Sequence, residues 1–179
     1  MCIRDRERQP RVRHELNLDL DNKRLKMQVV LNNCTLTAGY RSRYFVLNEV
    51  NATLDIDTQK KIAIDFVTGK FGGTMVGDGL EIKGDIGLAQ QIPHYDLHLE
   101  LYNVLPASLG IADIKDTVSI TAAVTGELPS PVIDGHLTFR ELNIPGLHFS
   151  KVRGDLHYED ALLKFTNVTG NVFGGTVEA

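Results

Sequence analysis

The sequence predicts an all-β protein: one elongated, twisted and mostly antiparallel sheet that curls into an open hydrophobic groove. Apolar and polar residues alternate with period two through most of the 179 residues, which gives each strand one apolar and one polar face. Turn signals separate these runs, and no long amphipathic helix is available to cover an apolar face. The sheet therefore has to curl over its own face, and a closed sandwich or barrel is the alternative.

Alternating runs begin near the N-terminus. Leucines alternate with Asn and Asp in 16–20, and Asp21-Asn22 is a turn signal. Apolar residues at every second position of 25–31 predict the return strand. The run 34–38 predicts a third strand, and 40–45 is expected to hold a connection.

The middle of the chain repeats this pattern. Apolar residues of 52–56 face one way, Thr58-Gln59-Lys60 is expected to turn, and 62–66 returns. The Gly77-Asp78-Gly79 sequence is a strong turn signal, and 80–86 is the next predicted strand.

One segment interrupts the alternation. After a strand at 97–101, the segment 105–110 is the place where a short helical turn is expected. Strands are predicted again at 118–124 and 137–139. Between them, Pro129-Ser130-Pro131 indicates a connection or an edge, because proline cannot donate to a ladder. The total is about ten strands.

Two similar units, 50–74 and 152–176, lie far apart in the chain, and Ile144-Pro145-Gly146 is a turn signal ahead of the second. Each consists of a strand, a polar turn and a returning strand. Both end in Phe-Gly-Gly-Thr, at 71–74 and 173–176, where the glycines are expected to permit a bend or bulge. Their offset exceeds the period of a solenoid repeat, which indicates a module of several strands that is used once and then begun again.

The ends and the composition limit the interpretation. We interpret 1–6, MCIRDR, as a non-native leader and 7–179 as a fragment of a repetitive β-sheet groove domain, with repeat-like units near 50–76 and 152–179. Net charge is −4 with both signs interspersed, which argues against a nucleic-acid partner. No apolar run approaches the ~18 residues of a spanning helix, so no transmembrane segment is expected in this fragment.

No catalytic pattern is present in the sequence. The histidines are scattered, and His98, His136 and His157 are expected on polar faces in contact with solvent. The two cysteines form neither a metal pattern nor a disulfide framework. We therefore expect no enzyme activity, no metal and no cofactor. A compact cluster of His and carboxylates in one pocket would reopen that question.

The apolar stripe has two interpretations, a packed core or an open groove that shields acyl chains. The groove needs no specific polar residue and therefore leaves no sharp motif. Its predicted lining is expected to share one face, because a register slip of one residue turns a strand inside out. The residues are Leu54, Ile56, Ile62, Ile64, Leu80, Ile82, Leu97, Leu99, Leu101, Val118, Ile120, Leu137, Phe139, Leu156, Leu163 and Phe165.

A family resemblance favours the groove. Residues 126–137 have the form G-x-L-x-x-P-x-I-x-G-x-L, and 144–146, 152–156 and 173–176 follow in the same succession. This succession, clearest from residue 118 onward, resembles the TamB and AsmA-like proteins of Gram-negative envelopes. The resemblance implies a taco-like trough and offers no catalytic residues.

The resemblance also implies a function. It predicts a segment of a periplasmic, inner-membrane-anchored protein for lipid transport and outer-membrane biogenesis. Phospholipid acyl chains and outer-membrane assembly proteins are the expected partners. The alternative is a structural or adhesive β-domain of a surface protein, with a dry core and no lipid conduit.

Overall fold

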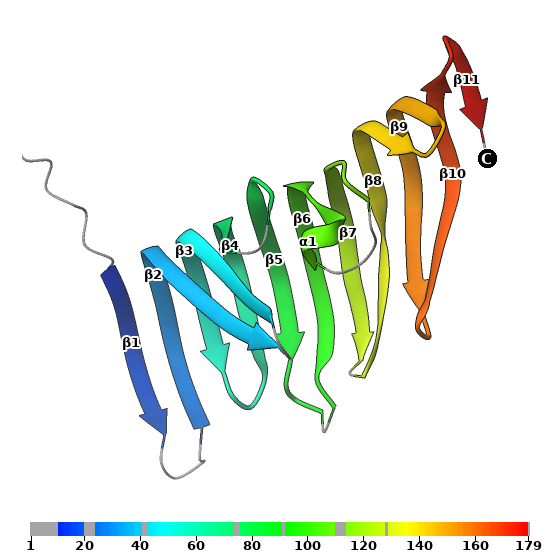
Figure 1. Ribbon diagram of the computed structural model, residues 1–179. Coiled ribbons are helices and arrows are strands. Elements are labelled where there is room, and N and C mark those ends of the chain that lie inside the picture. Colours follow the sequence, from blue (N-terminus) through cyan, green and yellow to red (C-terminus); the bar gives the residue numbers. More distant parts are fainter. Residues whose placement is uncertain are drawn as a thin grey trace, which may run out of the picture.

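One open antiparallel sheet makes up almost the whole protein. The computed structural model describes residues 11–19, 24–40, 43–73, 76–90, 92–109, 114–127 and 129–178. Eleven strands lie in chain order, β1 to β11, each antiparallel to the next, and the sheet does not close into a barrel (Figure 1). The predicted all-β, open antiparallel fold is confirmed.

The strands are long and are joined by short connections. Their bounds are β1 Arg11–Asp19, β2 Arg24–Tyr40, β3 Arg43–Asp57, β4 Lys61–Gly73, β5 Gly79–Gly87, β6 His94–Val104, β7 Val118–Glu127, β8 Ser130–Ile144, β9 Leu147–Glu159, β10 Leu162–Val172 and β11 Gly175–Glu178. The predicted helical turn is α1, Pro106–Leu109, which follows β6. The expected turn at 58–60 is also present.

One strand prediction was wrong. Residues 34–38 do not form a separate third strand but continue β2, which runs to Tyr40. Asn33 takes a left-handed conformation, φ 51°, and a register shift lies between Leu31 and Cys34. The interruption is thus a bulge within one strand rather than a turn between two. The predicted turn at Asp21-Asn22 and the leader 1–6 lie outside the described residues.

Bulges recur along the sheet and change which positions face the same way. The non-glycine residues with positive φ inside strands are Asn33, Glu49, Asn103, Lys151 and Asn167. At Asn103 the register shifts between Leu101 and Val104, so apolar positions three apart replace positions two apart. A bulge bends its strand and increases the local twist. These bulges help to curl a sheet that has no second layer.

Most of the larger buried side chains lie toward the α1 end of the sheet, and the small residues Ala52 and Ala122 are buried at its centre. Val50 and Val104 are fully buried, and Val118, Phe139 and Val152 are nearly so. The segment around α1 is tied to this region through the β4–β5 connection. The Leu105 amide donates to the Val76 carbonyl (2.8 Å), and the Val76 amide donates to Ser108 Oγ (3.1 Å).

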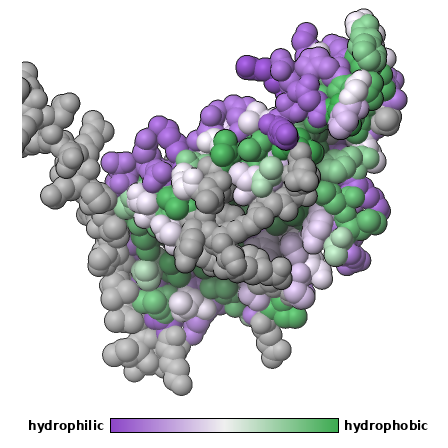
Figure 2. Space-filling view, viewed as in Figure 1, coloured by the Kyte–Doolittle hydropathy of each residue, from purple (hydrophilic) through white to green (hydrophobic). Residues whose placement is uncertain are grey.

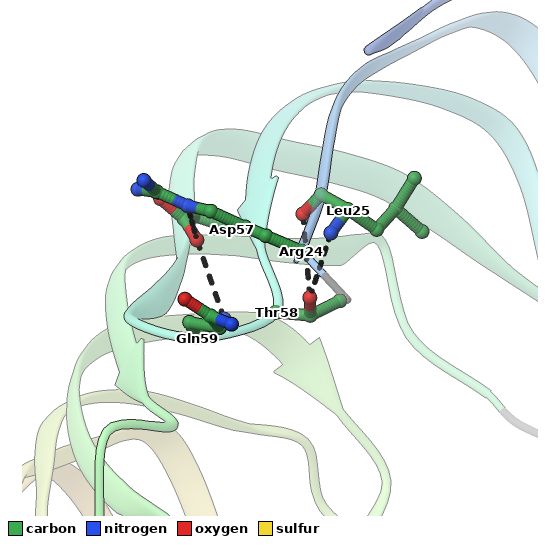
Figure 3. A network of polar contacts seen from close by, with 5 residues as sticks. All are labelled: Arg24, Leu25, Asp57, Thr58 and Gln59. Atoms are coloured by element: carbon green, nitrogen blue, oxygen red, sulfur yellow. Dashed lines mark hydrogen bonds and ion pairs between the residues drawn. The ribbon is translucent and has the colours of Figure 1, made fainter. Parts of the chain in front are cut away.

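A polar network fixes the opposite end of β2 to the β3–β4 turn (Figure 3). Arg24 donates to both carboxylate oxygens of Asp57, with Nε 2.9 Å from Oδ1. The Thr58 amide donates to the Leu25 carbonyl, and the Leu25 amide donates to Thr58 Oγ1, each at 3.1 Å. The Arg24 guanidinium holds the pKa of Asp57 at about 2, below its ordinary 3.8.

Replacing Asp57 with asparagine should therefore destabilise the protein in a pH-dependent way. A lowered carboxyl pKa contributes stability above the ordinary pKa and loses it as pH falls through about 2. We expect Asp57→Asn to lower the urea midpoint at about pH 6, and the difference from the parent to shrink at about pH 2. Asp55→Asn is the control, because Asp55 accepts only from Gln28 on an exposed surface. A gap that stays constant across this pH range would contradict the assignment.

Candidate functional site

One face of the sheet carries continuous rows of apolar side chains. Residues directly opposite one another in an antiparallel ladder lie on the same face, so the register defines each row. We call this surface the apolar face and the opposite surface the polar face. The apolar face holds five rows, each read across neighbouring strands: Gly69–Leu80–Leu101–Ile120–Leu137–Gly154, Ala52–Val67–Ile82–Leu99–Ala122–Gly135–Leu156–Phe165, Leu54–Ile64–Gly84–Leu97–Val124–Ile133–Tyr158–Leu163, Ile56–Ile62–Ile86–Tyr95–Gly126–Pro131 and Val104–Val118–Phe139–Val152.

All sixteen residues named from the sequence lie in these five rows. Val118, Leu137 and Phe139 are buried, and most of the others are half-buried. Leu163 and Phe165 on β10 are 42% and 53% exposed. The register brings the set onto one face, and exposure rises toward the C-terminal strands. That these side chains line a lipid groove stays a prediction.

Small residues lie in the middle of the apolar face, and the sequence reasoning did not select them. Ala122 pairs with Gly135, and Leu137 pairs with Gly154. A Cβ at Gly135 would lie 2.4 Å from the Thr121 carbonyl oxygen and 2.7 Å from the Ala122 Cβ. Glycine is therefore required at 135 because the β7 backbone approaches too closely for any side chain. The sequence does hold a signal for Gly135 and Gly154, because they occupy the same alternate positions as the apolar residues of their strands.

An apolar hollow of about 270 Å³ opens at the C-terminal end of this face. Its lining consists of Leu142, Ile144, Phe149, Val152, Val168, Thr169, Gly170 and Val177. Hydrophobic residues also gather over this part of the molecule in the surface view (Figure 2). Phe173 and Val177 are 84% and 42% exposed there. The apolar face is thus least covered at β10 and β11.

The polar face holds a cluster of histidines and carboxylates. His136 Nδ1 lies 2.6 Å from Asp155 Oδ1, and His157 Nδ1 lies 2.6 Å from Asp134 Oδ1. Both histidines lie on the polar face, as predicted, but each imidazole is hydrogen-bonded to a carboxylate rather than only solvated. The hydrogen bond to Asp134 raises the pKa of His157. The hydrogen bond from Asn167, followed by that of His136, lowers the pKa of Asp155.

With His98, these residues line one hollow, so they are the compact cluster of His and carboxylates that reopens the question of enzyme activity. The two Nδ1 atoms are engaged by carboxylates, and His157 Nε2 faces Glu159 at 3.5 Å. Thr121 and Thr166 line the same hollow of about 440 Å³, but no hydrogen bond joins either hydroxyl to an imidazole. Among the described residues no group of three or more His, Cys, Asp or Glu could hold a metal ion. The absence of enzyme activity stays a prediction.

Comparisons with known proteins add no relative. No family model matches the chain, and no curated protein or solved structure matches it significantly. Within the described ranges, no helix has both the length and the hydrophobicity needed to cross a membrane.

Proposed function

We propose that the apolar face binds phospholipid acyl chains, as a segment of a lipid-transport and outer-membrane biogenesis protein in the periplasm. One observation carries the proposal: apolar rows continue across β3 to β10 on a sheet that is not closed. An acyl chain that covers this face gains about 25 cal/mol per Å² of apolar surface removed from water. The periplasmic setting, the inner-membrane anchor and the assembly partners follow from the family resemblance alone.

The chemistry of the two faces supports acyl chains over a polar ligand. The five rows hold no charged side chain, whereas charges lie on alternate positions of the same strands. Lys83, His98 and Asp134 lie on the polar face, in one cross-strand row. A lipid that lies on the apolar face meets no unpaired charge, which would be costly beside an acyl chain.

The structural or adhesive alternative is favoured by a different observation. Val118, Leu137, Phe139 and Val152 form a buried cluster, as in a dry core. In that case the apolar face serves only packing, and no lipid enters. The half-buried residues of the central rows, such as Leu97 and Leu99, favour the groove, because a dry core would bury them fully.

Lipid extraction from vesicles tests the proposal. We expect the purified, detergent-free chain to take up a phosphatidylethanolamine with a pyrene-labelled acyl chain, measured after the vesicles are removed by centrifugation. Glycerophosphoethanolamine, which has the same headgroup and no acyl chains, should not compete. A folded chain that takes up no labelled lipid would reject the function.

A further inference from the structure

Two tyrosines interrupt the otherwise apolar rows. Every other position of the five rows is aliphatic, Phe, Gly or Pro, and only Tyr95 and Tyr158 carry a polar atom in the side chain. Both side chains are half-buried. No hydrogen bond joins either hydroxyl to another described residue. The contacts among the described residues therefore do not explain why these two positions carry a hydroxyl group.

Both tyrosines lie at the same end of the sheet. Tyr95 is the second residue of β6, and Tyr158 is the last but one of β9. In the antiparallel order this end carries the turns at 58–60 and 160–161. The buried residues Val104 and Val118 lie at the opposite ends of β6 and β7, and Val152 lies near the middle of β9. One end of the apolar face therefore carries two tyrosine hydroxyl groups, and the other end carries only apolar side chains.

The cross-strand partners of Tyr95 are Ile86 on one side and a glycine on the other. Tyr95 pairs with Gly126, and Gly126 pairs with Pro131 in the next strand. Tyr158 pairs with Ile133 and Leu163, so its ring continues an aliphatic row. Tyrosine combines a large apolar ring with one hydroxyl, which suits a boundary between apolar and wet surroundings.

We propose that the Tyr95 and Tyr158 hydroxyls bind the ester and phosphate oxygens of a phospholipid whose acyl chains lie on the apolar face. This inference rests on the proposed function and adds an orientation to it. The acyl chains run from the tyrosine end along the half-buried rows of the apolar face. The hydroxyls donate hydrogen bonds, and the lipid oxygens accept them.

Removal of the two hydroxyls tests this orientation without changing side-chain shape. Tyr95→Phe and Tyr158→Phe should each weaken binding of pyrene-labelled phosphatidylethanolamine about 2- to 10-fold, as expected for one lost hydrogen bond. Binding of 1-dodecylpyrene, a hydrocarbon without oxygen, should stay within about twofold of the parent. The double variant should lose more phospholipid affinity than either single variant.

Tyr102→Phe is the matched control. Tyr102 lies on β6, and its hydroxyl donates a hydrogen bond to Glu100 on the polar face. Loss of this hydroxyl should therefore leave the binding of both probes unchanged. Unchanged phospholipid affinity in the double variant would overturn the orientation while leaving the proposed function intact. Equal loss for both probes would also overturn it, because that result indicates a packing role. A parent chain that binds neither probe would reject both.

Discussion

Gly135→Val should destabilise the sheet strongly, with a loss of about 2 to 4 kcal/mol in the free energy of unfolding. A Cβ at this position would lie 2.4 Å from the Thr121 carbonyl oxygen and 2.8 Å from the Ala122 Cα. Both are backbone atoms, so β7 would have to move away from β8 and break ladder hydrogen bonds. Urea unfolding followed by circular dichroism measures the change.

Gly87→Val is the matched control for this substitution. Its Cβ would meet only the His94 carbonyl oxygen at 3.6 Å and the His94 Cβ at 3.7 Å, which are ordinary contacts. We expect a change within about 1 kcal/mol, because β-branched residues suit a strand. Equal destabilisation by the two substitutions would show that loss of glycine, rather than the close approach of β7, causes the effect.

Leu99→Asp should abolish lipid uptake while the chain stays folded. Leu99 is half-buried in the row between Ile82 and Ala122, at the centre of the apolar face. An unpaired carboxylate there would lie against acyl chains, where its desolvation is costly. We expect uptake of pyrene-labelled phosphatidylethanolamine to fall at least about tenfold. The far-UV circular dichroism spectrum should keep its β-sheet form.

His98→Asp is the neighbouring control on the polar face. His98 precedes Leu99 in β6 and points to the opposite, exposed surface. The new charge should leave lipid uptake within about twofold of the parent. If Leu99→Asp unfolds the chain instead, Leu99 belongs to a dry core and the structural alternative is favoured.

The alternation of apolar residues predicted the strands well because each apolar position has to share a face with its cross-strand neighbours. It could not predict the bulges. Lys151 and Glu49 take positive φ, which neither residue favours locally, so the conformation is imposed by the ladders on each side. Strict alternation places Leu101 and Val104 on opposite faces, whereas the bulge at Asn103 brings both onto the apolar face.

The repeated Phe-Gly-Gly-Thr motif is a second case in which the local sequence does not predict the structure. In the first unit, Phe71, Gly72 and Gly73 stay in β4 and pair with β3. In the second unit, Phe173 and Gly174 form the turn between β10 and β11. Glycine permits both conformations, so the neighbouring strands decide between them.

The candidate site likewise has a part that the sequence predicts and a part that it does not. The aliphatic positions follow from period two, and the register places all sixteen named residues on the apolar face. Tyr95 and Tyr158 occupy equivalent positions but were not selected, because a search for apolar stripes favours aliphatic residues and Phe. Their importance depends on the absence of other polar atoms in the rows, which only the cross-strand register reveals.

Photo-crosslinking of lipid is the most direct test of the acyl-chain groove. A photoreactive amino acid is placed singly at Leu54, Leu99, Leu137 or Phe165 on the apolar face, and at Asp55, Glu100 or Lys164 on the polar face. The folded chain is incubated with radiolabelled phosphatidylethanolamine and irradiated. The groove predicts labelling from the apolar-face positions and little from the polar-face positions. Equal labelling of both sets, or none from the apolar face of a folded chain, would contradict it.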